Sequence, residues 1–167
     1  MTTTEQVDRA ADQAGILLRR ATAADRDALL EMYVTFEPKG ASLGLPPLLN
    51  VEEWLDWLTP GSNFVVQADQ RIVGHGVLCP EGDSAEVAIF VHQGFRGRGL
   101  GRLLLRTLVE EAQRMGLRRV WGVTELDNLP MLRLANSLGF VSGDDPGEFY
   151  LDLRADARPL PAGDCAA

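Results

Sequence analysis

The sequence predicts one mixed α/β domain, and three observations support this fold class. The 167 residues make a chain of single-domain length, and 46% apolar against 24% charged residues is typical of a folded globular protein. Short runs of β-branched and aromatic residues alternate with segments whose apolar residues recur every three or four positions. Clusters of glycine and proline separate these segments. The predicted order of elements is β-α-α-β-β-β-α-β-α-β, and an extra strand at residues 140–141 is left open.

The N-terminal part of this pattern predicts one strand and two helices. Residues 16–20 form the first predicted strand. Thr22, followed three residues later by Asp25, is typical of a helix start, because each side chain can accept a hydrogen bond from the other's backbone N–H. Prolines and glycines make residues 37–49 a loop, and Asn50 is expected to cap the short helix that follows.

The rest of the chain predicts five more strands and two more helices. The strands are expected at residues 64–66, 72–78, 85–92, 118–124 and 149–153. The longer helix starts at Leu100, and its apolar residues lie on one face. The shorter helix starts at Pro130 and is ended by Gly139, the usual placement of these two residue types.

Composition excludes several classes of protein. The net charge of −8 argues against a general nucleic-acid binder, because such proteins need a basic face. No apolar run is long enough to cross a bilayer, and the polar N-terminus is unlike a signal peptide, so a cytoplasmic protein is expected. Two cysteines and two histidines without metal-ligand spacing predict no metal site. We expect tails at residues 1–15 and 155–167, on either side of a domain at residues 16–154.

A glycine cluster between the strand at residues 85–92 and the following helix carries the most functional information. It alternates glycine with arginine, as Arg96, Gly97, Arg98, Gly99, Leu100, Gly101 and Arg102. Bare backbone N–H groups at a helix start bind phosphate groups, and the arginines would add mobile positive charge. A tight turn that only needs glycine's φ freedom is the alternative. A Walker loop is excluded because the only lysine is Lys39, and the spacing does not match G-x-G-x-x-G.

The run from Arg96 to Gly101 resembles the signature Q/R-x-x-G-x-G/A of the GNAT acyl-CoA-dependent N-acyltransferases. Asn128, after a strand, and Leu138-Gly139-Phe140, at the end of the next helix, lie where that family has them. The resemblance covers about residues 16–154. It implies a single-domain GNAT fold, with a mixed sheet of about six to seven strands splayed between strands 4 and 5 and flanked by four helices.

The resemblance also implies an acetyl-CoA site. The pyrophosphate would lie on the glycine loop, the pantetheine arm would pair with a strand edge like an added strand, and Asn128 would reach the cosubstrate from the far side. The residues implied are Ile89, Phe90, Val91, Arg96, Gly97, Arg98, Gly99, Leu100, Gly101, Arg102 and Asn128.

Glu86 is the candidate base for removing a proton from the acceptor amine. Strand alternation places Glu86 with Ala88 and Phe90 on one face, and an acid at the start of an apolar strand is costly without a purpose or a partner. The alternative is a solvated acid at the strand end. Glu125 and Asp127 are weaker candidates, and Asp127 fits turn chemistry better.

Other residues bear on the subgroup and on packing. Many members of the GNAT family have a proton-donating tyrosine where this sequence has Ala135, while the surrounding pattern resembles bacterial protein lysine acetyltransferases. His75 is expected in the core or at an edge, and His92 in solvent. Four aromatic residues are expected to pack, with the wall of an acceptor site as the alternative: Tyr33, Phe36, Trp54 and Trp57.

These features predict an enzyme that transfers acetyl from acetyl-CoA to a primary amine, either a protein lysine or a small molecule. No nucleic-acid or membrane partner is expected, and a homodimer is left open. Two other functions remain open. The first is an acyl-CoA-binding sensor without turnover. The second, a transferase acting on charged tRNA, is disfavoured by the negative charge.

Overall fold

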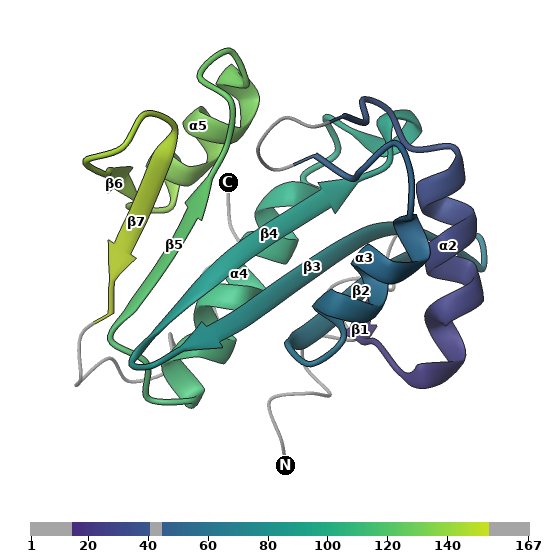
Figure 1. Cartoon of the computed structure of the whole chain (residues 1–167), viewed down its shortest axis with the longest axis horizontal. Helices are drawn as coiled ribbons and strands as arrows, with labels where there is room; N and C mark the ends of the chain where they lie inside the picture. The colour runs from purple at the N-terminus through teal and green to yellow at the C-terminus, as the bar shows by residue number, and fades with distance from the viewer. Residues whose placement is uncertain (1–14, 41–44, 154–167) are drawn as a thin grey trace.

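The computed structural model describes residues 15–40 and 45–153, which form one seven-stranded sheet with helices on both faces (Figure 1). The strand order is β1-β2-β3-β4-β5-β7-β6, and every pair is antiparallel except β4 with β5. The strands are β1 (Ile16–Arg20), β2 (Ser62–Ala68), β3 (Arg71–Glu81), β4 (Ser84–Val91), β5 (Arg119–Val123), β6 (Val141–Ser142) and β7 (Glu148–Asp152).

Four α-helices in the described part of the chain cover this sheet. They are α2 (Arg26–Val34), α3 (Val51–Leu58), α4 (Leu100–Arg114) and α5 (Leu129–Ser137), with 3₁₀ turns η2 (Ala23–Asp25) and η3 (Gln93–Phe95). The leucines of α4 and the apolar residues of α5 form the larger core with one face of the sheet. Helices α2 and α3 form a second core with the other face of β2, β3 and β4. Figure 1 shows α2 and α3 in front of the sheet and α4 behind it.

The predicted fold class is confirmed, and so is each predicted strand and helix, within a few residues at the ends. The turn at Thr22 forms as expected, because the Asp25 carboxylate accepts a hydrogen bond from the Thr22 N–H at 2.7 Å. That carboxylate also accepts two hydrogen bonds from Arg19, each 2.7 Å, which offsets its burial.

The expectation that the Asn50 side chain caps α3 is wrong. Asn50 lies at the N-cap position, but its φ of 59° is left-handed and its side chain makes no capping hydrogen bond. Its backbone carbonyl instead accepts from the Trp54 N–H at 3.0 Å. Asparagine serves here because it tolerates the left-handed conformation better than most residues.

The sheet is splayed between β4 and β5, as the resemblance implied. These strands pair only where Ser84, Ala85 and Glu86 lie opposite Arg119, Val120 and Trp121. On its other edge β4 pairs with β3 over its whole length. The backbone of β4 beyond Glu86 therefore has a free edge on the side of β5. Figure 1 shows the ribbons of β4 and β5 diverging.

The two predicted tails lie outside the described residues: residues 155–167 entirely, and residues 1–15 except for Gly15. Within the described ranges, no helix combines the length and apolar character needed to span a membrane.

Candidate active site

The glycine loop leads directly into the first turn of α4. Gly97 and Gly99 have φ values of 73° and 81°, and a Cβ on either would meet no atom within 4 Å. Backbone conformation, rather than crowding, therefore requires glycine at both positions. The N–H groups of Leu100, Gly101 and Arg102 lie in the first turn of a 15-residue helix, where they have no intrahelical acceptor. This turn has the geometry of an anion site.

The Arg96 side chain is fixed by hydrogen bonds, whereas the sequence suggested a mobile positive charge at this position. Its Nε donates to the Val91 carbonyl at 2.9 Å and its Nη2 to the Glu37 carbonyl at 2.5 Å. The guanidinium carbon also lies 5.2 Å from the centre of the Phe36 ring, and burial lowers the pKa of Arg96. The side chain is held in place, so its contact with a cosubstrate stays a prediction.

The other two arginines of the loop each make one side-chain hydrogen bond. Arg98 donates to the Gly94 carbonyl at 3.3 Å and lies over the Phe95 ring, 4.9 Å from its centre. Arg102 donates to the Ser137 hydroxyl at 3.0 Å, which links α4 to α5. Arg98 precedes the first turn of α4 and Arg102 belongs to it, so both arginines are candidates to pair with a phosphate there.

Several hydrogen bonds tie η3 to the chain that leaves α2. Gln93 donates from Nε2 to the Thr35 carbonyl at 2.6 Å and accepts at Oε1 from the Glu37 N–H at 3.0 Å. The Thr35 hydroxyl lies 3.1 Å from His92 Nε2, so His92 is partnered and only partly exposed. Together with Arg96, these contacts form what we call the η3 latch: Thr35, Glu37, His92, Gln93 and Arg96.

The free edge of β4 lies beside the glycine loop. A Cβ on Gly101 would be 3.7 Å from Ile89 Cδ1 and 4.0 Å from Val91 Cγ2, so these two side chains face α4. Phe90 points to the opposite face and packs in the core of α2 and α3. Backbone groups of successive residues point to alternate edges of a strand. The His92 N–H donates to the Val73 carbonyl on β3, so the backbone of Phe90 also faces β3, and only Ile89 and Val91 turn theirs toward the gap.

Glu86 lies at the closed end of the splay, in the last residue pair that β4 makes with β5. Ala88 and Phe90 pack on the side of α2 and α3, so the predicted alternation is confirmed and Glu86 shares their face. Its side chain is half-buried rather than fully solvated. Burial raises the pKa of Glu86, and the negative charge of Glu81 raises it further.

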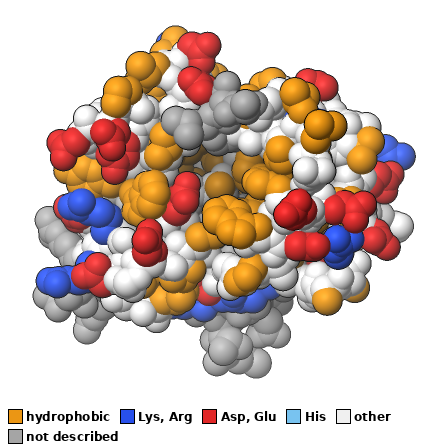
Figure 2. Space-filling view, viewed as in Figure 1, with side chains coloured by type: hydrophobic (Ala, Val, Ile, Leu, Met, Phe, Trp, Pro, Cys, Tyr) orange, Lys and Arg blue, Asp and Glu red, His pale blue; other side chains and the backbone are white. Residues whose placement is uncertain are grey.

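The face that carries Glu86 is hollowed near its centre, as Figure 2 shows. Hydrophobic and acidic side chains surround the hollow in this view, and lysine and arginine side chains lie toward the periphery. The hollow is on the side of the sheet away from α4. An acceptor approaching there would meet the gap from the side opposite the anion site.

Comparison with known proteins identifies the family. The sequence model of the acetyltransferase (GNAT) family matches residues 26–140. The chain belongs to the GNAT family. Its members are acyltransferase enzymes that use acetyl-CoA as cosubstrate, and the splayed sheet and glycine loop described above are consistent with that use.

Individual relatives resemble this GNAT chain over shorter stretches. It is 34% identical over 74 residues to acetyltransferase PA5475 of Pseudomonas aeruginosa, covering 44% of this chain and 39% of that protein. It is 40% identical over 58 residues to the L-methionine sulfoximine/L-methionine sulfone acetyltransferase of Salmonella typhimurium, covering 35% of this chain and 34% of that protein. The chain thus spans well under half the length of these curated relatives.

The fold also matches solved structures of the family. A phosphinothricin acetyltransferase of Sinorhizobium meliloti, solved in complex with acetyl-CoA, has a TM-score of 0.68 and 20% identity, covering 83% of this chain and 89% of that one. At this identity the likeness supports the shared fold only.

Asn128 is held by two contacts at the start of α5. Its Oδ1 accepts from the Met131 N–H at 3.3 Å and its Nδ2 donates to the Thr124 hydroxyl at 2.9 Å. It therefore caps the helix, and its reach toward the cosubstrate stays a prediction. Asp127 lies in the preceding turn, where its carbonyl accepts from the Leu129 N–H at 2.8 Å, in line with turn chemistry.

Ala135 lies on α5, where many GNAT members have a tyrosine. It is 1% exposed and part of the larger core. This position therefore offers no hydroxyl. Among the described residues, no three His, Cys, Asp or Glu side chains are grouped as metal ligands would be.

The aromatic residues near α2 pack, as expected. Tyr33 and Phe36 are buried, and the Trp54 ring lies 5.0 Å from that of Tyr33 in an edge-on arrangement. His75 is fully buried, with Nδ1 2.6 Å from the Tyr33 hydroxyl and Nε2 2.7 Å from Asn63 Oδ1. Trp57 is the exception, because it is 70% exposed on α3.

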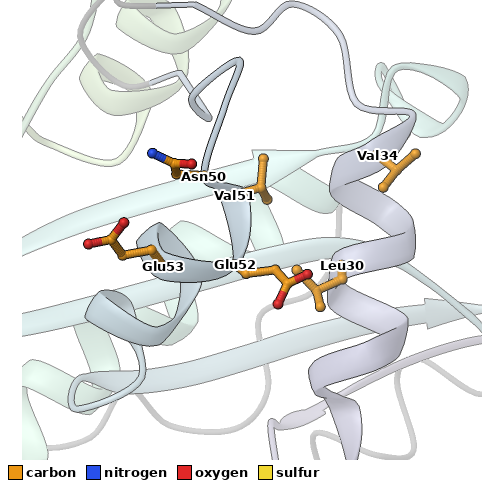
Figure 3. A pocket seen from close by; sticks show the side chains of 6 residues that line it. All are labelled: Leu30, Val34, Asn50, Val51, Glu52 and Glu53. Carbon is orange, nitrogen blue, oxygen red and sulfur yellow. The ribbon is translucent and has the colours of Figure 1, made fainter.

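A groove of about 460 Å³ lies between α2 and α3 and is separate from the splay. Figure 3 shows Glu52 pointing toward Leu30 and α2, whereas Glu53 points away from α2. The lining residues are Leu30, Val34, Asn50, Val51, Glu52 and Glu53. No residue of the predicted site lines this groove.

Sequence reasoning missed two aromatic residues on the face of Glu86. Trp121 lies opposite Glu86 across the β4–β5 pair, and Tyr150 lies opposite Trp121 on β7. Both are partly exposed. Only the strand register brings them to Glu86, and no local pattern in the sequence encodes that register.

Proposed function

We propose that this protein is an N-acetyltransferase that moves the acetyl group of acetyl-CoA to a primary amine by direct attack, with Glu86 as the base. One observation carries the proposal: the gap between β4 and β5 has an anion site at its open end and a half-buried carboxylate at its closed end. Such an arrangement suits a long cosubstrate with a diphosphate at one end and a reactive thioester at the other.

Backbone groups of the chain bind this cosubstrate, and two arginine side chains support them. The free N–H groups of Leu100, Gly101 and Arg102 face the diphosphate, and Arg98 and Arg102 add charge. The unpaired edge of β4 beyond Glu86 offers backbone donors and acceptors to the amide groups of the pantetheine arm, as in strand addition.

Glu86 meets the main energetic demand of the reaction. An alkyl ammonium with a pKa of about 10.4 must lose a proton before it attacks, which costs roughly 4.6 kcal/mol at pH 7. The Glu86 carboxylate takes that proton, directly or through water. The amine nitrogen then bonds to the acetyl carbon while the carbon–sulfur bond breaks. The sulfur leaves as a thiolate and takes up a proton from solvent, the second proton lost from nitrogen passes to solvent, and Glu86 releases its own proton to solvent as well.

No side chain at position 135 protonates the leaving sulfur, because Ala135 is buried and apolar. A thiol has a pKa of about 8.5, so its anion is a tolerable leaving group near neutral pH. Solvent can supply the proton through the open splay.

The proposal is tested by thiol release from acetyl-CoA with a panel of primary amines. Glu86→Gln should lower kcat/KM by about a hundredfold or more and remove the acid limb of its pH profile. Glu31→Gln, a change of the same kind at an exposed site on α2, is the control and should leave both unchanged. An unaltered rate and profile in Glu86→Gln would exclude Glu86 as the base.

A sensor that binds acyl-CoA without turnover is the second candidate, favoured by Ala135. The same assay separates the two functions. A sensor would bind acetyl-CoA by calorimetry yet release no thiol above background hydrolysis with any amine, whereas the transferase releases thiol in step with acetylated amine.

A further inference from the structure

A row of four side chains crosses the sheet at the closed end of the splay. The strand register places Cys79 of β3 opposite Glu86, Glu86 opposite Trp121, and Trp121 opposite Tyr150. Directly paired residues point to the same face of a sheet. The acceptor row, as we call Cys79, Glu86, Trp121 and Tyr150, therefore lies on one face.

That face is the one away from α4. The residues that alternate with the row, Val87, Val120 and Phe149, all belong to the core that α4 and α5 cover. All four members of the row are partly exposed. The row thus lines the side from which an acceptor would approach the gap, across from the anion site.

The row combines one acid with two aromatic rings. Burial raises the pKa of the Cys79 thiol and the negative charge of Glu86 raises it further, so the residue beside Glu86 on β3 stays neutral. On the other side, the strand register places the indole of Trp121 directly beside Glu86. Aromatic faces attract ammonium groups and also pack against methylene chains. The structure already contains one such contact in the row, since the Arg119 guanidinium lies 4.2 Å from the centre of the Tyr150 ring.

The row contains no cation to pair with a carboxylate. Arg119, two residues before Trp121 and on the same face of β5, is engaged with Asp152 at 2.6 Å and with the Tyr150 ring. Glu53, on α3, points away from α2 (Figure 3) and adds a further negative charge to the face of the sheet that α2 and α3 cover. A carboxylate on the same carbon as the reacting amine would lie close to Glu86 without compensation.

We propose that the acceptor row selects a primary ammonium on an uncharged methylene stem and rejects α-amino acids, with Trp121 as the specificity-determining contact. This inference rests on the proposed function and names its substrate class. The same chemistry occurs in a lysine side chain within a protein and in a small alkyl amine. It differs from the amino-acid analogues named for the Salmonella relative.

The test uses two acceptors that differ only in the carboxylate. Pentylamine and L-norleucine share the amine and its alkyl chain, and norleucine adds a carboxylate to the amine carbon. We expect kcat/KM for pentylamine to exceed that for norleucine roughly tenfold or more, although the less basic amine of norleucine is more often neutral. Equal or better use of norleucine would overturn the inference while leaving the transferase activity in place.

Trp121 is tested with the same pair. Trp121→Leu should raise the KM for pentylamine roughly tenfold and leave kcat and acetyl-CoA affinity nearly unchanged, and Trp121→Phe should restore most of the loss. Leu17→Thr, a surface change on β1 at the opposite edge of the sheet, is the control. An unchanged KM in Trp121→Leu would remove Trp121 from the acceptor contact.

Binding and turnover separate this inference from the proposed function. Calorimetric binding of pentylamine to the coenzyme A complex, lost in Trp121→Leu but without thiol release in the wild type, would support the row and refute the transferase. Thiol release with equal use of pentylamine and norleucine would support the transferase and refute the selectivity of the acceptor row. Two further acceptors then distinguish a protein lysine from a small amine as the substrate. One is a peptide with blocked ends and a single lysine, and the other is 1,5-diaminopentane.

Discussion

Glu86 shows how burial and one neighbouring charge together raise the pKa of a base. Its pKa is raised first by burial and then by Glu81 at the end of β3. Because the carboxylate form is the base, kcat/KM should rise as pH increases through that pKa. Glu81→Gln removes a negative charge and should lower the pKa of Glu86, so the acid limb moves to lower pH at an unchanged plateau. A limb that stays in place, or moves upward, would show that another group titrates.

His75 makes a second prediction at the scale of a single residue. Burial lowers its pKa to about 3, against about 6.5 for a free imidazole. Burial also raises the pKa of Tyr33, so its hydroxyl stays protonated and donates to Nδ1, while Nε2–H donates to Asn63. Asn63 is oriented by donating from Nδ2 to the Leu58 and Gly61 carbonyls.

The consequence is a loss of stability in mild acid. Between pH 6.5 and 3 the unfolded chain binds a proton at His75 that the folded chain does not. The free energy of unfolding therefore decreases as the pH is lowered, by up to about 1.4 kcal/mol for each pH unit. Urea unfolding at pH 7, 6 and 5 measures this slope. His75→Gln is less stable at pH 7 but should lack the slope contributed by the imidazole. Parallel pH dependence in both proteins would mean that His75 is not the group responsible.

At the scale of elements, the η3 latch connects the anion site to the segment that leaves α2. Gln93 makes two of its hydrogen bonds and lies between β4 and the glycine loop. Gln93→Ala should therefore loosen the segment after α2 and raise the acceptor KM several-fold, while the affinity for acetyl-CoA changes little. Gln113→Ala, near the C-terminal end of α4, is the matched control. Equal effects on both substrates would argue that the latch only supports the glycine loop.

The elements themselves could be predicted because their signals are local. Each signal connects residues that are close together in the sequence. Examples are the alternation in β4, the three- and four-residue spacing of apolar residues in α4, and the pair Thr22 and Asp25. Asn50 was misjudged because asparagine suits both a cap and a left-handed residue, and only the backbone decides between them.

The site could be predicted only in part. The glycine loop is a local motif, and Glu86 follows from strand alternation. Trp121, Tyr150 and the bonds of Arg96 depend on which strands pair and at which register, which is set by contacts between distant parts of the chain. Gly147 is a further residue whose role depends on a distant part of the chain. A Cβ there would lie 2.0 Å from the Thr124 carbonyl oxygen, and no local sequence pattern predicts that contact.

For the whole molecule, the main feature is that few residue pairs join the two halves of the sheet, β1–β4 and β5–β7. Three residue pairs connect β4 to β5, whereas eight connect β3 to β4. A cosubstrate arm lying in the gap would act as an added strand between the halves. Coenzyme A should therefore raise the unfolding free energy by about 2.7 kcal/mol at a hundred times its Kd, measured as a higher Tm.

Hydrogen exchange locates that stabilisation. If the arm runs along the free edge, coenzyme A should slow amide exchange in residues 87–91 of β4 as well as in the first turn of α4. Adenosine 3′,5′-diphosphate carries nucleotide phosphates but no arm, so it should protect the first turn of α4 alone. If both ligands protect β4 equally, the effect reaches the strand through the protein, and the free edge of β4 is not where the pantetheine arm binds.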